Sequence, residues 1–225
     1  MRQPAALACA TKSLTLEQAT ALLQAAKSTP LYAYVTLSLL IGARTEELRA
    51  LTWSHVNLTG QPDAEPPVPP SVELWRSVRA GGDTKTRKSR RTLALPRRCV
   101  TALQHHRQQQ QRQRTDAGKR WQDHGLVFTT AYGTALDAAN VRRTFRRIVA
   151  AAGLNPADWT PRELRHSFVS LLSADGVPIE TIADLCGHAG TTVTEKVYRL
   201  QLRPVLLGAA VVMDRIFAEP PTGPA

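Results

Sequence analysis

One segment, 31–43, restricts the fold of this chain more than any other. Its sequence, LYAYVTLSLLIGA, has no charged side chain and would be apolar on every face of a helix. Such a helix is buried inside a globular protein. It is too short to cross a bilayer, and the chain has no uninterrupted apolar stretch of about 18 residues, close to the length that a membrane span needs. The sequence therefore predicts a globular fold around a buried helix that follows Pro30.

Other segments have the start signals and periodicity of amphipathic helices. Thr15 and Gln18 have the spacing of a capping box, and so do Thr160 and Glu163. Apolar residues then recur at helical spacing. A further helix opens at Pro96, and its polar continuation, QHHRQQQQRQR at 104–114, is either a solvated helix end or a low-complexity loop. The remaining helices are expected over 15–27, 44–53, 140–152, 160–174, 179–185, 192–203 and 205–217.

Three short segments favour strands, over 55–58, 71–78 and 91–95. The Pro-rich stretch at 61–70 can be neither a helix nor a central strand, so we expect an exposed loop between the first two. A Gly-Gly-Asp turn at 81–83 joins the last two into a hairpin. The predicted fold class is α+β, mainly helical, with a small three-stranded antiparallel sheet.

The charge balance points to a polyanionic partner. The chain has 29 Lys and Arg against 18 Asp and Glu, a formal net charge of +11. We expect nucleic acid before an anionic membrane surface. The three cysteines, Cys9, Cys99 and Cys186, are scattered and fit neither a disulfide framework nor a zinc spacing, which favours a reducing, cytoplasmic location.

Two basic clusters could carry chemistry. On the helix that begins at Thr160, Arg162, Arg165 and His166 fall on one face, near an N-terminus that favours anions. The alternative there is a solvated basic face. The second cluster is TKTRKSRR at 84–91, at the expected hairpin tip, and its alternative is a general basic patch.

Two further signals are weak when taken alone. Arg44 directly follows the buried segment, so it is either half of a structural ion pair, with Glu47 as a partner, or a phosphate clamp. Gly187-His188 follows a short helix and precedes Tyr198. A single histidine or tyrosine is more often structural than catalytic.

Taken together and in order, these segments form a far more specific signal than any one of them alone. GARTEELRALTW, TKTRKSRRTLALP, TPRELRHSFVSLL, LCGHAG and TEKVYRL resemble, in order and spacing, the catalytic domain of the tyrosine recombinase (phage integrase) family. The resemblance covers roughly residues 14–217. The C-terminal half is most similar to integrases of actinobacterial mobile elements.

The resemblance implies a role for each matching residue. Arg44 and Arg165 resemble the two catalytic arginines, Lys85 the hairpin lysine, His188 the late histidine and Tyr198 the nucleophile. Arg162 stands where most of the family has histidine, and arginine cannot accept a proton at neutral pH. The supporting residues are Glu47 and His166. The DNA-binding residues are expected to be Arg87, Lys88, Arg90 and Arg91.

The implied reaction is site-specific cleavage and rejoining of DNA strands through a 3′-phosphotyrosine. It conserves bond energy, so no nucleotide cofactor is expected. No metal is expected either, because the sequence shows no Asp/Glu triad or Cys/His cluster that would suggest one. Two fork-shaped guanidinium groups suit the charge of the transition state. A phenol with an ordinary pKa of about 10 needs such neighbours to ionise, and Lys85 suits a general acid.

The resemblance also implies an organisation and partners. We expect a lead-in over 1–13, the catalytic domain over 14–217 and a mobile tail over 218–225, without the family's N-terminal core-binding domain. The expected partners are double-stranded DNA, further copies in a tetramer on DNA, and accessory excision or DNA-bending proteins, at the nucleoid. The expected helix over 205–217 packs either on its own domain or on a neighbouring protomer.

Two rival functions remain at this point. A truncated, non-catalytic DNA-binding remnant would keep the fold and lose turnover, although the other catalytic positions are present. A basic helical protein that binds RNA would explain the charge, but it would not explain the ordered Arg, Lys, Arg, His and Tyr set.

Overall fold

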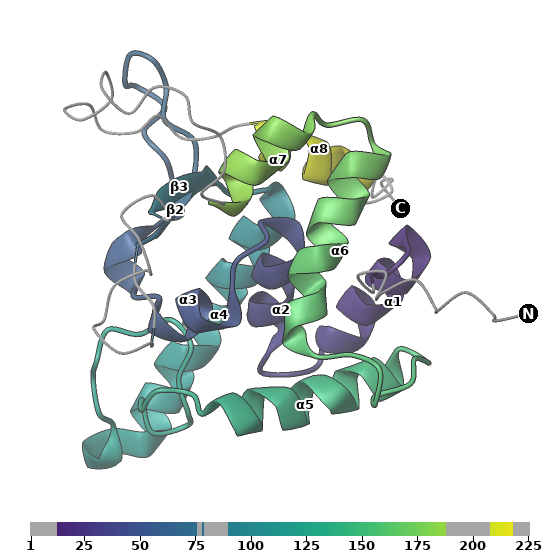
Figure 1. Cartoon of the computed structure of the whole chain (residues 1–225). Coiled ribbons are helices and arrows are strands. Elements are labelled where there is room, and N and C mark those ends of the chain that lie inside the picture. The colour runs from purple at the N-terminus through teal and green to yellow at the C-terminus, as the bar shows by residue number, and fades with distance from the viewer. Residues whose placement is uncertain (1–12, 76–77, 79–89, 188–207, 218–225) are drawn as a thin grey trace, which may run out of the picture.

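The computed structural model describes residues 13–75, 78, 90–187 and 208–217. Its helices are α1 (Leu16–Ala26), α2 (Tyr32–Leu40), α3 (Thr45–Ala50), α4 (Arg97–Ala117), α5 (Ala138–Ala151), α6 (Pro161–Ala174), α7 (Ile179–Cys186) and α8 (Gly208–Ile216). The strands are β1 (Val56–Asn57), β2 (Ser71–Leu74) and β3 (Arg91–Ala94). Figure 1 shows a helical body with the small sheet at one side. The predicted class, mainly helical with a three-stranded antiparallel sheet, is confirmed.

Helix α2 is the buried helix that the apolar segment 31–43 predicts. Every residue of α2 after Tyr32 is buried. It contacts α1, α3, α4 and α6, and Figure 1 shows it in the middle of the helical body. Its hydroxyl groups are satisfied locally, since Thr36 donates to the Tyr32 carbonyl at 2.8 Å and Ser38 donates to the Ala43 carbonyl at 3.3 Å. No helix in the described part of the chain is long and apolar enough to span a membrane.

The sheet has the strand order β1–β2–β3, with both pairs antiparallel. Val72 pairs with Leu93 and Leu74 pairs with Arg91 in its register. Val72, Leu74 and Leu93 are buried, so one face of the sheet closes the core. Strand β2 ends at Leu74, earlier than the range 71–78 predicts, and residues 76–77 lie outside the described residues.

The helix starts follow the capping signals. The Thr15 and Thr160 boxes both form, and each hydroxyl oxygen accepts a backbone N–H from the first turn of its helix. Helix α5 begins at Ala138, two residues before the predicted start, because the Asp137 carboxylate accepts the N–H groups of Ala139 and Asn140.

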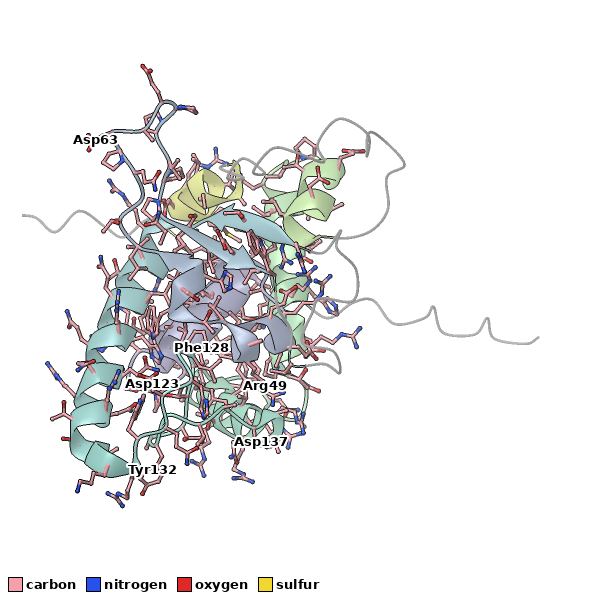
Figure 2. The ribbon with its side chains drawn as sticks, turned by 90° about the vertical axis from the view of Figure 1, so that its left-hand side faces the viewer. Arg49, Asp63, Asp123, Phe128, Tyr132 and Asp137 are labelled. Atoms are coloured by element: carbon pink, nitrogen blue, oxygen red, sulfur yellow. The ribbon has the colours of Figure 1, made fainter. Side chains whose placement is uncertain are left out.

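The segment before α5 is fixed to α3. The Arg49 side chain of α3 donates from Nε to the Leu136 carbonyl at 2.7 Å. Figure 2 shows Arg49 and Asp137 on the same side of the molecule. The first turn of α5 is thereby held against the helix that follows Arg44.

The polar tract 104–114 is helical throughout, as part of α4. Its Gln110 is buried, with Oε1 accepting from Trp53 Nε1 at 2.7 Å and Nε2 donating to the Val127 carbonyl at 2.9 Å. His106 also hydrogen-bonds the Val127 carbonyl. Burial, the first cause, outweighs that bond and lowers the pKa of the His106 imidazole. The tract is therefore a helix end whose inward face anchors the loop around Val127.

The final described helix, α8, packs on its own chain. Met213 is fully buried, and Ala209 and Phe217 are nearly so, against elements that include α4, α6 and β3. The Asp214 carboxylate accepts the backbone N–H of Arg97 at 2.7 Å. The described part of the helix over 205–217 thus packs on its own domain within the single chain, and docking on a neighbouring protomer stays a prediction. Residues 205–207, the lead-in over 1–12 and the tail over 218–225 lie outside the described residues.

Gly42 follows the C-terminal end of α2 and lies against Phe168 of α6. Its φ is +62°, and a Cβ placed there would lie 2.6 Å from Phe168 Cδ1 of α6. The absence of a side chain at Gly42 is therefore what allows Phe168, and with it this part of α6, to approach the backbone so closely.

We predict that Gly42→Ala destabilises the fold. A non-glycine residue in the left-handed region costs about 1–3 kcal/mol, and the contact with Phe168 adds an overpacking cost. Gly153→Ala is the matched control, because Gly153 also has a positive φ but open space around its Cβ position. Urea unfolding should show the larger loss for Gly42→Ala. Equal losses for the two variants would contradict the close contact.

Candidate active site

Four segments that are distant in the sequence meet at one place. They are the start of α3, the start of β3, the second turn of α6 and the end of α7. Their side chains and backbone bring together Arg44, Glu47, Arg91, Arg165 and the carbonyl of Cys186. We refer to these five residues as the arginine cluster.

Glu47 holds Arg44 by two different bonds. Its Oε2 accepts the backbone N–H of Arg44 at 2.8 Å, and its Oε1 accepts Arg44 Nη1 at 2.7 Å. The first bond is a helix-capping interaction at the start of α3. The Glu47 side chain is 2% exposed, whereas that of Arg44 is 32% exposed. The ion pair that the sequence offers as one alternative for Arg44 is therefore present, and part of Arg44 still faces solvent.

Arg91 binds the same carboxylate from the sheet. Its Nη1 donates to Glu47 Oε1 and its Nη2 to Glu47 Oε2, both at 2.9 Å. This is the parallel two-bond geometry that suits a guanidinium and a carboxylate. Burial raises the pKa of Glu47, but the charge of Arg91 and the bonds from both arginines outweigh it and hold that pKa below its usual value.

The burial of Arg91 corrects one expectation. The Arg91 side chain is 3% exposed and faces Glu47, so it does not offer its guanidinium to DNA from the surface. The alternation along β3 contains the signal, because Arg91 lies on the same face as Leu93, which is buried. Arg90 is partly exposed and directly precedes β3.

Arg165 shares an acceptor with Arg44. Its Nη1 donates to the Gly42 carbonyl at 2.5 Å and its Nη2 donates to the Cys186 carbonyl. Arg44 Nη2 reaches the same Cys186 carbonyl at 3.4 Å. Burial, followed by the positive charges of Arg91 and Arg44, lowers the pKa of Arg165 to about 10. The convergence expected for Arg44 and Arg165 is therefore present.

The Cys186 carbonyl is well placed to accept these donors. It belongs to the last residue of α7, where helix carbonyls lack intrahelical partners and carry negative partial charge. Gly187 then adopts the left-handed conformation, with φ 60°, and ends the helix. The buried thiol of Cys186 stays protonated at neutral pH, because burial raises its pKa above the ordinary value.

The other expected site residues are less closely tied to the cluster. Arg162 is exposed in the first turn of α6, and its guanidinium makes no hydrogen bond or ion pair with any described residue. His166 is half-buried on the same helix. Lys85, Arg87, Lys88, His188 and Tyr198 lie outside the described residues, so their positions stay predictions.

The cluster is rich in positive charge. Within the part of the chain that the structure describes, Arg44 and Arg91 share the carboxylate of Glu47 in their ion pairs, and the third guanidinium, of Arg165, donates to the Gly42 and Cys186 carbonyls. Desolvated positive charge of this kind favours an anion. The described residues contain no group of three or more His, Cys, Asp or Glu side chains that could hold a metal ion.

Comparison with known proteins agrees with the ordered motifs. A sequence model of the Phage integrase family matches residues 12–202. An integrase of Streptomyces ambofaciens is 62% identical over 211 residues, which make up 93% of this chain and 54% of that protein. This chain therefore spans about half the length of that relative.

Solved structures show the same fold. XerA recombinase superposes with a TM-score of 0.62 at 24% identity, over 82% of this chain and 61% of that chain. The Tn1549 transposon integrase, solved in complex with transposon right end DNA, gives a TM-score of 0.63 at 16% identity, over 93% of this chain and 62% of that chain. With a family match over most of its length and a 62% identical relative, this chain belongs to the phage integrase family.

Proposed function

We propose that this chain acts on double-stranded DNA as the catalytic part of a site-specific recombinase. In this proposal Tyr198 cleaves a strand and forms a covalent 3′-phosphotyrosine, which a second strand then resolves. The observation that carries the proposal is the convergence of Arg44 and Arg165 on one carbonyl oxygen, in a member of the phage integrase family.

The guanidinium groups of Arg44 and Arg165 both donate to the Cys186 carbonyl oxygen. Phosphate oxygens are hydrogen-bond acceptors of the same kind and also carry negative charge, so a phosphate suits this pair of donors. Among its contacts with described residues, the Arg44 side chain directs one N–H to Glu47 and one to Cys186. A guanidinium has five N–H donors, so others remain for a nonbridging phosphate oxygen. Arg44 is the partly exposed arginine of the cluster, and we place the phosphate on its solvent side.

The proposed step balances without a cofactor. The Tyr198 phenol gives its proton to His188 as its oxygen attacks phosphorus, the bond to the 5′-oxygen breaks, and Lys85 protonates that oxygen as it leaves. The products are a 3′-phosphotyrosine and a 5′-hydroxyl. Attack by the 5′-hydroxyl of another strand reverses the step and releases the tyrosine. Arg44 and Arg165 stabilise the extra negative charge of the transition state, and His188 hydrogen-bonds the phosphate.

Arg162 gives this site a different composition from the family's usual one. It lies three residues before Arg165 on α6, a spacing that puts both on one side of a helix. We propose that it donates a hydrogen bond to the phosphate or to the tyrosine oxygen. It does not act as a base, because a guanidinium stays protonated at neutral pH.

The proposed partners follow from charge and from the family. The net charge of +11 favours DNA, and the Tn1549 integrase is a structural neighbour solved with DNA. Several copies are needed to exchange strands between two duplexes, so we propose a tetramer on DNA, with accessory excision or DNA-bending proteins joining it at the nucleoid. Arg87, Lys88 and Arg90 would bind the phosphate backbone.

We predict that Arg165→Ala lowers the rate of covalent adduct formation by about 100- to 1000-fold, the usual loss for one oxyanion donor. The DNA duplex is first selected from a randomised pool by its covalent capture on the wild-type chain, and adducts are then counted on denaturing gels. Arg165→Lys, which keeps the charge without the fork, should also be slow.

Two controls accompany this measurement. Arg114→Ala removes an exposed arginine whose ion pair with Asp123 lies outside the cluster, and it should leave the rate unchanged. Tyr198→Phe should abolish the adduct. Near-normal cleavage by Arg165→Ala would exclude its proposed role, and an adduct in Tyr198→Phe would exclude the nucleophile.

We predict that binding to a duplex depends steeply on salt. The logarithm of the affinity should fall with the logarithm of salt concentration, with a slope of about −0.9 for each phosphate neutralised. Fluorescence anisotropy with a labelled duplex at several salt concentrations measures this slope. An affinity that hardly changes between low and physiological salt would contradict a phosphate-dominated interface.

A further inference from the structure

The pair of Arg91 and Glu47 is buried more completely than a DNA contact would be. The two side chains are 3% and 2% exposed. A buried ion pair adds little net stability, because desolvation of both charges offsets most of their attraction. Stability of the fold is therefore a poor explanation for this pair, and its geometry offers a better one.

Both oxygens of Glu47 are shared between two arginines. Oε1 accepts from Arg44 Nη1 at 2.7 Å and from Arg91 Nη1 at 2.9 Å. Oε2 accepts from the Arg44 backbone at 2.8 Å and from Arg91 Nη2 at 2.9 Å. The terminal torsion of a glutamate is broad, so a carboxylate held from one side can turn. The two parallel bonds from Arg91 fix its plane, and the carboxylate then fixes the direction of the Arg44 guanidinium.

Arg91 is itself held by a rigid element. It is the first residue of β3 and pairs with Leu74 of β2 in the antiparallel register. Arg44, in contrast, lies at the start of a short helix and is partly exposed. The chain of contacts thus runs from the sheet through Arg91 and Glu47 to the arginine that faces solvent.

We propose that Arg91 is a positioning residue, which acts through Glu47 to hold the Arg44 guanidinium in its phosphate-binding orientation. The inference about phosphate rests on the proposed function, whereas the orientation of Arg44 is a property of the free protein. Arg91 itself touches neither DNA nor the reacting atoms. Its loss should therefore lower the cleavage rate while DNA affinity stays close to that of the wild type.

The first measurement is made on the free full chain by NMR of the arginine Nε–Hε groups. The Arg44 signal is the one that disappears from the spectrum of Arg44→Lys. Arg91→Lys keeps the buried positive charge but cannot make the two parallel bonds. It should release Arg44, whose order parameter should fall below about 0.6, the flexible range. Arg114→Lys, the same change at an exposed ion pair, should leave Arg44 unchanged. Equal order of Arg44 in the wild type and Arg91→Lys would overturn the proposal.

The second measurement is the rate of adduct formation on the selected duplex. Arg91→Lys should be about 100-fold slower than the wild type, the loss that a misplaced catalytic group causes, with little change in DNA affinity. In an Arg44→Ala background the same change should have almost no further effect, because the group that Arg91 positions is gone. Additive losses would show that Arg91 acts elsewhere, and a wild-type rate in Arg91→Lys would overturn its role.

These two measurements separate the proposals. A wild-type chain that forms no tyrosine-dependent adduct would refute the proposed function, and the NMR result would still decide whether Arg91 orients Arg44. Arg91→Met, which also removes the charge, supplies a second variant. Unfolding curves for all variants identify any that are merely unfolded, and of the two Arg91 variants Arg91→Lys should keep the wild-type midpoint more closely, because it keeps the buried charge.

Discussion

Burying α2 on every side requires other helices around it, and the chain meets this need with α1, α3, α4 and α6. The same requirement sets the position of the arginine cluster. At the end of α2 the backbone turns at Gly42, against the ring of Phe168, and Arg44 follows two residues later. Arg165 of α6 then donates to the Gly42 carbonyl. Core packing and site geometry therefore depend on the same short stretch of backbone.

The fold could be predicted from the sequence wherever a local signal decides the outcome. The Thr15 and Thr160 capping boxes, for example, start their helices as expected. Tertiary contacts decided the rest. The tract 104–114 is polar on every face, and only the structure shows that Gln110 turns inward to bind the loop around Val127. The range 140–152 begins two residues after the true start of α5, because the Asp137 side chain caps the helix before the apolar periodicity begins.

The candidate site was predictable only in part, because some of its contacts leave a signal in the sequence and others arise only from the tertiary fold. The order of the motifs indicated Arg44 and Arg165, and their side chains do converge. The acceptors between them are backbone carbonyls, which every residue has, so no sequence pattern identifies them. The neighbours of Arg91 in the sequence are basic, and they predict that it belongs to the DNA-binding hairpin. Residue composition does not predict the β2–β3 pairing, which turns the Arg91 side chain toward the buried carboxylate of Glu47.

The lowered pKa of Arg165 has a consequence for folding. Burial and the charges of Arg91 and Arg44 bring this pKa down to about 10, well below the ordinary value of an arginine. Below pH 10 the group is protonated in the folded and the unfolded chain, so the unfavourable free energy is fully present at neutral pH. It declines only as the pH rises above 10. A shift of this size corresponds to about 3 kcal/mol, a large part of the stability of an ordinary domain. An anion that binds only the folded chain at this cluster offsets that cost, so DNA bound as we propose would also stabilise the folded domain.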